Sequence, residues 1–120
     1  VEEAAEAAAI LAKELNTTLA ITGPVDLITD GERVCRVSNG HELMGCVTGT
    51  GCTATAIMGA YLGIDDDAVE AATTALAYFG VAGEKGALQA QAPGSFQIAL
   101  LDALYTIDED TLKDKARIQA

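Results

Sequence analysis

The sequence predicts an α/β fold in which a few strands are followed by several helices. Three observations support this prediction. An Ala-rich helical pattern leads into a short β-branched stretch, an Asp-Gly pair separates two strand-like runs, and helical patterns fill the second half. The chain has 120 residues, the length of one domain or a part of one. We therefore treat residues 1–120 as a single segment.

The first expected helix precedes a short strand. Residues 1–14 are rich in Ala, Glu and Leu and carry acidic residues at their start, which favours a helix. No N-cap residue precedes this pattern, so we expect the chain to be part of a longer natural sequence. Residues 17–21 are β-branched and are followed by Gly23 and Pro24. This pattern predicts a buried strand that forms half of a βαβ unit.

A hairpin is expected next. Residues 26–29 and 33–38 are strand-like, and residues 30–32 between them contain an Asp-Gly pair, which is typical of a tight turn.

A glycine-containing loop at residues 48–52 then opens onto an apolar helical pattern. The acidic residues 65–67 favour the start of another helix, which we expect to pack antiparallel to the one before. Its predicted buried stripe is Val69, Ala72, Leu76, Phe79 and Gly83.

The C-terminal part predicts two more helices. Residues 89–95 are polar and contain Pro93 and Gly94, so a helix is expected after them. Phe96, Leu100 and Leu104 interleave with Ile98, Leu101 and Tyr105 at helical spacing, which predicts a helix buried on two sides. From residue 108 the acids come first and the bases last. This order favours a surface helix, and we expect a frayed tail behind it.

Charge and hydropathy exclude several classes of function. The chain has 7 basic and 18 acidic residues and a formal net charge of −11, which argues against binding to nucleic acid or to an anionic membrane. No apolar run approaches the roughly 18 residues of a membrane span, and no stretch has the pattern of a signal peptide. We therefore expect a soluble cytoplasmic protein.

The residues that most often bind metals are sparse. Cys35, Cys46 and Cys52 lack the spacing of zinc or redox motifs, and His41 is the single histidine. A disulfide scaffold or a closed metal site is therefore not expected, and His41 is expected to face solvent without a catalytic role. The acidic runs at 65–67 and 108–110 are interpreted as helix starts, because neighbouring acids on a helix point in different directions.

The loop at residues 48–52 is the strongest candidate site. Its glycines allow successive N–H groups to converge beside the positive end of a helix, an arrangement that binds phosphate oxygens. It lacks the Lys-Ser or Lys-Thr of a Walker A loop, and a plain structural turn is the alternative. Cys52 at the helix start could act as a base or nucleophile because the helix dipole favours its thiolate. For Cys52 the alternative is a small buried hydrophobic residue, and Cys35 and Cys46 are interpreted as such residues.

Five segments together resemble a known family. They are AITGPVD at 20–26, NGH at 39–41, VTGTGC at 47–52, PGSFQ at 93–97 and LLDALY at 100–105. In this order they resemble the hydroxyethylthiazole kinases, thiamine-salvage members of the ribokinase-like kinases. The resemblance covers about residues 5 to 107. It implies the C-terminal half of a three-layer α/β/α fold, in a protein that is usually a trimer.

The resemblance also implies an activity and site residues. The family uses ATP and Mg²⁺ to phosphorylate the hydroxyl of 4-methyl-5-(2-hydroxyethyl)thiazole. By this resemblance Cys52 is the catalytic base, and the N–H groups of Gly49, Thr50, Gly51 and Cys52 form an anion hole. Gly49 also matches a position that contacts the thiazole alcohol, and Thr22 matches an ATP-binding threonine. The region of Gly94 matches a structural loop.

Some expected parts are missing or changed. The family's Mg²⁺-organising acids, most of its thiazole pocket and another ATP-binding residue belong to the N-terminal half, so no metal ligand is assigned here and the chain alone is expected to lack activity. Cys46 stands where a Lys is expected and Gly45 where a Thr is expected. Two alternatives remain: hydroxymethylpyrimidine phosphate kinase, and a non-catalytic nucleotide-binding or interface half-domain.

Overall fold

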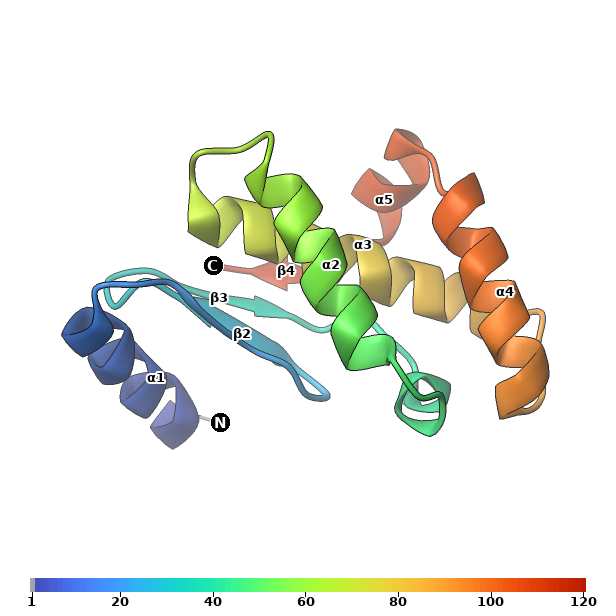
Figure 1. Cartoon of the computed structure of the whole chain (residues 1–120), viewed down its shortest axis with the longest axis horizontal. Helices are drawn as coiled ribbons and strands as arrows, with labels where there is room; N and C mark the ends of the chain where they lie inside the picture. Colours follow the sequence, from blue (N-terminus) through green and yellow to red (C-terminus); the bar gives the residue numbers. More distant parts are fainter. Residues whose placement is uncertain (1) are drawn as a thin grey trace.

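The computed structural model describes residues 2–120 and confirms an α/β fold, in which three strands follow one helix and precede the other helices, and a short strand ends the chain. Figure 1 shows its elements along the chain. The helices are α1 (Glu2–Leu15), the short 3-10 helix η1 (Glu42–Cys46), α2 (Thr50–Leu62), α3 (Ala68–Ala87), α4 (Pro93–Thr106) and α5 (Glu109–Lys115). The strands are β1 (Leu19–Ile21), β2 (Asp26–Thr29), β3 (Val34–Val37) and β4 (Ile118–Gln119).

The strands form one antiparallel sheet in the order β1-β2-β3-β4. The predicted hairpin is confirmed: β2 and β3 pair with Asp26 opposite Val37 and Thr29 opposite Val34. In its turn, the Asp30 carboxylate accepts hydrogen bonds from the N–H groups of Glu32 and Arg33, at 3.0 and 2.9 Å. These bonds lower the pKa of Asp30 to about 2, and the bond from the Arg33 amide has the largest effect.

Strand β1 differs from its expected environment. We expected a buried strand, but Ala20 and Ile21 are exposed and Leu19 is half-buried. The reason is that β1 lies at the edge of the sheet and pairs only with β2. That pairing is antiparallel, and among residues 2–120 no strand supplies the parallel partner of a βαβ unit.

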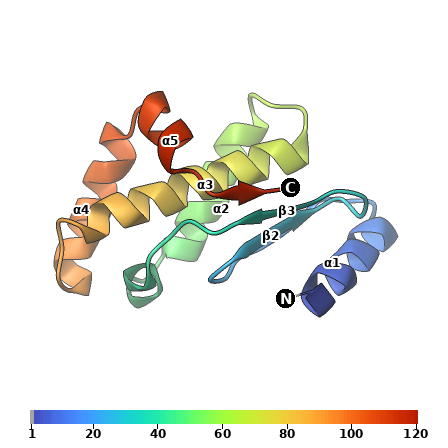
Figure 2. The ribbon, with the colours of Figure 1, turned by 180° about the vertical axis from the view of Figure 1, so that it is seen from behind.

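Helices lie on both faces of the sheet, as a three-layer order requires. α1 packs against β2 on one face, and α3 crosses the other face in contact with β2 and β3 (Figures 1 and 2). The buried side of α1 is made of small residues, Ala5, Ala8 and Ala12, which allow the helix to approach the strands closely. Its larger side chains Leu11 and Leu15 are exposed.

Helix α3 forms the centre of the molecule. All five residues of its predicted stripe are buried, which confirms that expectation. Its N-cap is Asp67, whose carboxylate accepts from the N–H groups of Val69 and Glu70. Arg33 of the hairpin turn also pairs with Asp67, with Nη1 2.7 Å from Oδ2, and so links the sheet to this helix. The Arg33 side chain is the first cause of a lowered Asp67 pKa.

Helix α4 is buried on one side only, so the prediction of two buried sides is wrong. Phe96, Leu100 and Ala103 are buried against the rest of the molecule, where Gly86 of α3 lets the backbone of Leu100 come close. On the other side Ile98, Leu101 and Tyr105 are 67%, 60% and 91% exposed. A helical pattern reports which residues are apolar, but it does not report whether both faces have partners.

The C-terminal tail is ordered, which corrects the expectation of fraying. After α5, residues 118–119 form β4, which pairs with β3. A polar cluster fastens this end: the buried Asn39 donates through Nδ2 to Glu84 Oε2 (2.7 Å) and to the Lys115 carbonyl (2.9 Å), and its Oδ1 accepts from Arg117 N (2.7 Å). Arg117 also pairs with Glu84, at 2.8 Å.

None of the helices within residues 2–120 combines the length and the hydropathy that crossing a membrane requires.

Candidate functional site

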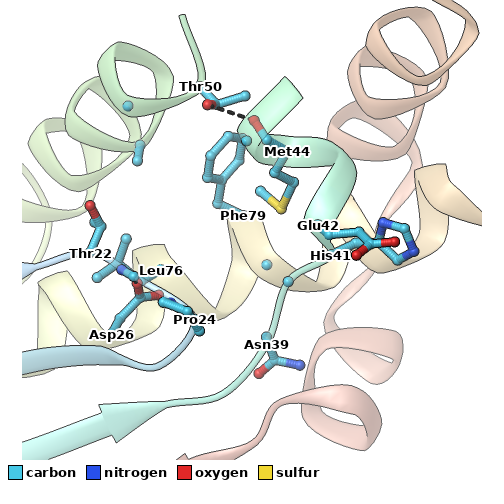
Figure 3. Close-up of a pocket in the computed structure, with 16 residues that line it drawn as sticks. Thr22, Pro24, Asp26, Asn39, His41, Glu42, Met44, Thr50, Leu76 and Phe79 are labelled. Atoms are coloured by element: carbon cyan, nitrogen blue, oxygen red, sulfur yellow. Dashed lines mark hydrogen bonds between the residues drawn. The ribbon is translucent and has the colours of Figure 1, made fainter. Parts of the chain in front are cut away.

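A cavity of about 570 Å³ lies between the β1–β2 loop, η1, the start of α2 and the middle of α3 (Figure 3). Its walls come from four parts of the chain that are distant in sequence. The residues that line it include Thr22, Asp26, Met44, Thr50, Gly51 and Phe79. Of the predicted site residues, Thr22, Thr50 and Gly51 line this cavity together.

The predicted glycine loop does open onto a helix. Gly49 is the residue before α2 and has φ 94°, a left-handed conformation that glycine adopts without steric cost. No side chain caps this helix start. Among residues 2–120, the N–H groups of Thr50, Gly51 and Cys52 find no acceptor. These free donors and the helix dipole together favour an anion at this position.

Gly49 and Cys52 lie beside the cavity and do not line it. Cys52 belongs to the first turn of α2 and is exposed. Successive helical residues are rotated by about 100°, so residue 52 points away from the side on which residues 50 and 54 line the cavity. The helix start therefore separates the cavity from the Cys52 thiol. The alternative of a small buried hydrophobic residue does not hold for Cys52.

The β1–β2 loop carries Thr22 at the cavity wall. Asp26 shapes this loop: it is only 8% exposed, and its Oδ1 accepts from Gly23 N at 3.0 Å. Burial raises the pKa of Asp26, and the Gly23 hydrogen bond opposes that effect. Sequence analysis did not single out Asp26. The signal available was an Asp three residues after a Gly in a turn, a spacing that allows the carboxylate to accept from the backbone.

The opposite wall of the cavity is η1. His41 caps this short helix, because its Nδ1 accepts from Leu43 N at 3.1 Å. It is exposed, as expected. Cys46 on η1 is also exposed, so the expectation that it is a buried residue is wrong, while Cys35 on β3 is half-buried. Met44 also lines the cavity, which sequence analysis did not predict. Its side chain packs against Gly83 of α3, 39 positions later in the chain, and no local sequence pattern indicates such a contact.

Comparison with known proteins identifies the family. A model of the "HK: Hydroxyethylthiazole kinase family" matches residues 1–110. The hydroxyethylthiazole kinase of Desulfotalea psychrophila is 57% identical over 119 residues, covering 99% of this chain and 44% of the relative. The hydroxyethylthiazole kinase of Moorella thermoacetica is 49% identical over 109 residues, covering 91% of this chain and 41% of the relative.

A solved structure gives the same result. The hydroxyethylthiazole kinase protein of Pyrococcus horikoshii matches with a TM-score of 0.94 and 45% identity, over 98% of this chain and 46% of that one. The chain thus spans less than half the length of the relatives that it matches. Fold, motif order and sequence identity agree along almost the whole chain, and the chain therefore belongs to the hydroxyethylthiazole kinase family.

Proposed function

We propose that the polypeptide carrying this chain transfers the γ-phosphoryl group of ATP to the hydroxyl of 4-methyl-5-(2-hydroxyethyl)thiazole. Its relatives at 57% and 49% identity bear the name hydroxyethylthiazole kinase. The observation that carries the proposal is the uncapped start of α2, where three unpaired N–H groups adjoin a cavity large enough for part of a nucleotide. Phosphoryl transfer depends mainly on such positioning and on electrostatic stabilisation.

The two sides of the helix start suggest two roles. Thr22 and the N–H groups of Thr50 and Gly51 belong to the cavity, so we place the ATP phosphates there. Cys52 points away from the cavity, so we place the acceptor alcohol on that outer side, next to Gly49. The transferred phosphoryl group then lies at the positive end of α2, where the free N–H groups stabilise its oxygens.

The chemical step is an in-line displacement. The alcohol oxygen forms a bond to Pγ, and the bond between Pγ and the bridging oxygen breaks, leaving its electron pair on the β-phosphate of ADP. Cys52, as the thiolate, accepts the proton of the alcohol. Its exposed position in the first turn leaves the sulfur accessible to a substrate from outside.

Mg²⁺ is a proposal for the whole polypeptide only. The described residues contain no group of three or more His, Cys, Asp or Glu side chains that could hold a metal ion. Because Mg²⁺ in kinases is usually held by one or two carboxylates together with the nucleotide phosphates, we propose that acids of the N-terminal half, as the family resemblance implies, help to bind it. A homotrimer and a cytoplasmic location, both implied by the family resemblance, stay predictions.

The deciding experiment measures ADP formation from ATP and Mg²⁺, with and without hydroxyethylthiazole. It is done on the 120-residue chain and on the full natural polypeptide that contains it. We expect thiazole-dependent ADP formation in the full polypeptide only. ADP formation that depends on hydroxymethylpyrimidine phosphate instead would contradict the proposal, and ATP binding without any turnover would support a non-catalytic half-domain.

A further inference from the structure

Met44 joins two elements of the candidate site. It lies on η1 at the cavity wall (Figure 3), and its side chain rests on α3 at Gly83. A Cβ placed on Gly83 would come within 3.0 Å of Met44 Cγ and 3.1 Å of its Cε, and closer still to its Sδ. Only the approach to Sδ is closer than real Cβ atoms come, so a side chain at position 83 would force the flexible Met44 side chain to move.

The backbone of the same residue holds the start of α2. Thr50, the first residue of α2, donates its hydroxyl hydrogen to the Met44 carbonyl at 2.9 Å, and a weaker contact reaches the Val47 carbonyl at 3.4 Å. No side chain caps α2, and Gly49 before it is a flexible residue type. Thr53 also donates its hydroxyl hydrogen at this helix start, to the Gly49 carbonyl at 2.8 Å, but the hydroxyl of Thr50 is the contact that ties the helix start to η1.

From these contacts we infer that Met44 is a positioning residue for phosphoryl transfer. The chain of contacts runs from Gly83 of α3 through the Met44 side chain to the Met44 carbonyl and then to Thr50. A shift of η1 moves the anion-binding N–H groups relative to the cavity. This inference rests on the proposed function, because it assigns these N–H groups to the transferred phosphoryl group.

The first test is Gly83→Ala in the full natural polypeptide. The added methyl group displaces a flexible side chain and replaces a helical glycine, so the melting temperature stays the same or rises. We expect kcat for the thiazole to fall about tenfold or more, because small displacements of catalytic groups are costly. Gly59→Ala on α2 is the matched control, since a Cβ there meets nothing within 4 Å.

A double variant separates this cause from others. In a Met44→Ala background no long side chain remains for the methyl group to displace, so adding Gly83→Ala should lower kcat by less than threefold. Equal losses in both backgrounds would overturn the inference. Should Gly83→Ala fail to fold, Thr50→Val and Thr50→Ser decide instead. Val removes the hydroxyl and should lower kcat about tenfold, whereas Ser keeps the hydroxyl and should lower kcat clearly less than Val does.

A chemical readout makes the test independent of kinase activity. The rate at which iodoacetamide alkylates Cys52, measured by mass spectrometry of its peptide, reports the surroundings of the α2 start. We expect Gly83→Ala and Thr50→Val to change this rate at least threefold, Gly59→Ala to leave it unchanged, and Thr50→Ser to change it less than Thr50→Val does. Equal rates in all variants would overturn the inference, while a normal pattern of rates without thiazole-dependent turnover would count against the proposed function alone.

Discussion

Cys52 is the proposed base that accepts the proton of the acceptor alcohol. We expect Cys52→Ala in the full polypeptide to lower kcat by roughly a hundredfold or more, because the base that receives the alcohol proton is removed. ATP affinity should change little, since the phosphate donors are backbone N–H groups. Cys52→Asp should retain activity because a carboxylate accepts the same proton. Steady-state kinetics and ATP titration check both variants.

The control for Cys52 is Cys46→Ser. Cys46 is an exposed cysteine on η1 and lies outside the helix start, so its replacement should leave kcat near wild type. If Cys52→Ala kept full turnover, the cysteine would have no part in the mechanism. If Cys52→Asp were as inactive as Cys52→Ala, a structural role for the thiol would explain the loss better than proton transfer.

Asp26 should make stability depend on pH in an unusual direction. Burial raises its pKa in the folded state above the usual value of 3.8, so the folded state holds the proton more tightly than the unfolded state does. Its stabilising contribution is therefore present below pH 3.8 and is lost as the pH rises through the folded-state pKa. At neutral pH the molecule carries a buried carboxylate at some cost in stability.

Asp26→Asn tests this expectation. The amide oxygen can still accept from Gly23 N, but it carries no charge. The variant should melt at a higher temperature than wild type at pH 7, and the difference should shrink as the pH is lowered toward 3.8. Thermal denaturation at several pH values measures the difference. A gain that is the same at every pH would show that the charge of Asp26 is not its cause.

At the level of elements, glycines decide how closely the segments approach. Gly80 of α3 faces Asn39, and a Cβ at this position would lie 2.5 Å from Asn39 Cβ and 2.7 Å from its backbone carbon. Gly80→Ala should therefore destabilise the fold by about 1–3 kcal/mol, because backbone cannot yield as a flexible side chain can. Gly59→Ala should instead stabilise it by about 0.5–1 kcal/mol. Urea denaturation compares the two, and equal effects would contradict the close approach.

Local patterns predicted most elements, and contacts between elements explain the failures. The Asp-Gly turn and the stripe from Val69 to Gly83 depend on neighbouring residues, so the sequence was sufficient for the hairpin and for α3. The burial of β1 and of the outer face of α4 depends on partners elsewhere, and both were predicted wrongly. The C-terminal strand β4 has only two residues, too few for a pattern.

The candidate site shows the same division. The free N–H groups at α2 follow from a glycine loop before a helix, so they were predictable from the sequence. The seat of Met44 at Gly83 and the polar cluster of Asn39 join residues far apart in the chain, and no spacing indicates them. The roles proposed for Thr22 and Cys52 come from motif resemblance, because the chemistry of the single residues left them open.

The whole molecule exposes more apolar surface than a small acidic protein needs. Exposed large apolar residues occur on α4, at the end of α3 and on α1: Ile98, Leu101, Tyr105, Leu88, Ile10, Leu11 and Leu15. Surfaces of this kind associate in water. We therefore expect the 120-residue chain by itself to form oligomers at micromolar concentration, measured by sedimentation velocity.

A charge placed on α4 tests this. Leu101→Glu should shift the sedimentation toward the monomer, because a carboxylate cannot be buried in an apolar contact without cost. Thr55→Glu adds the same charge on the exposed side of α2 and should change association far less. A wild-type chain that stays monomeric across the concentration range would contradict the expectation.

The Asn39 cluster has a consequence for the order in which the molecule folds. Asn39 bonds to residues 76 and 78 positions later in the chain, and the segment that it anchors continues into the cavity wall at Gly40 and His41. Closing so long a loop is slow compared with forming the adjacent hairpin. The β1-β2-β3 part of the sheet can therefore form early, whereas the cavity wall reaches its final position only after α5 and β4 have docked.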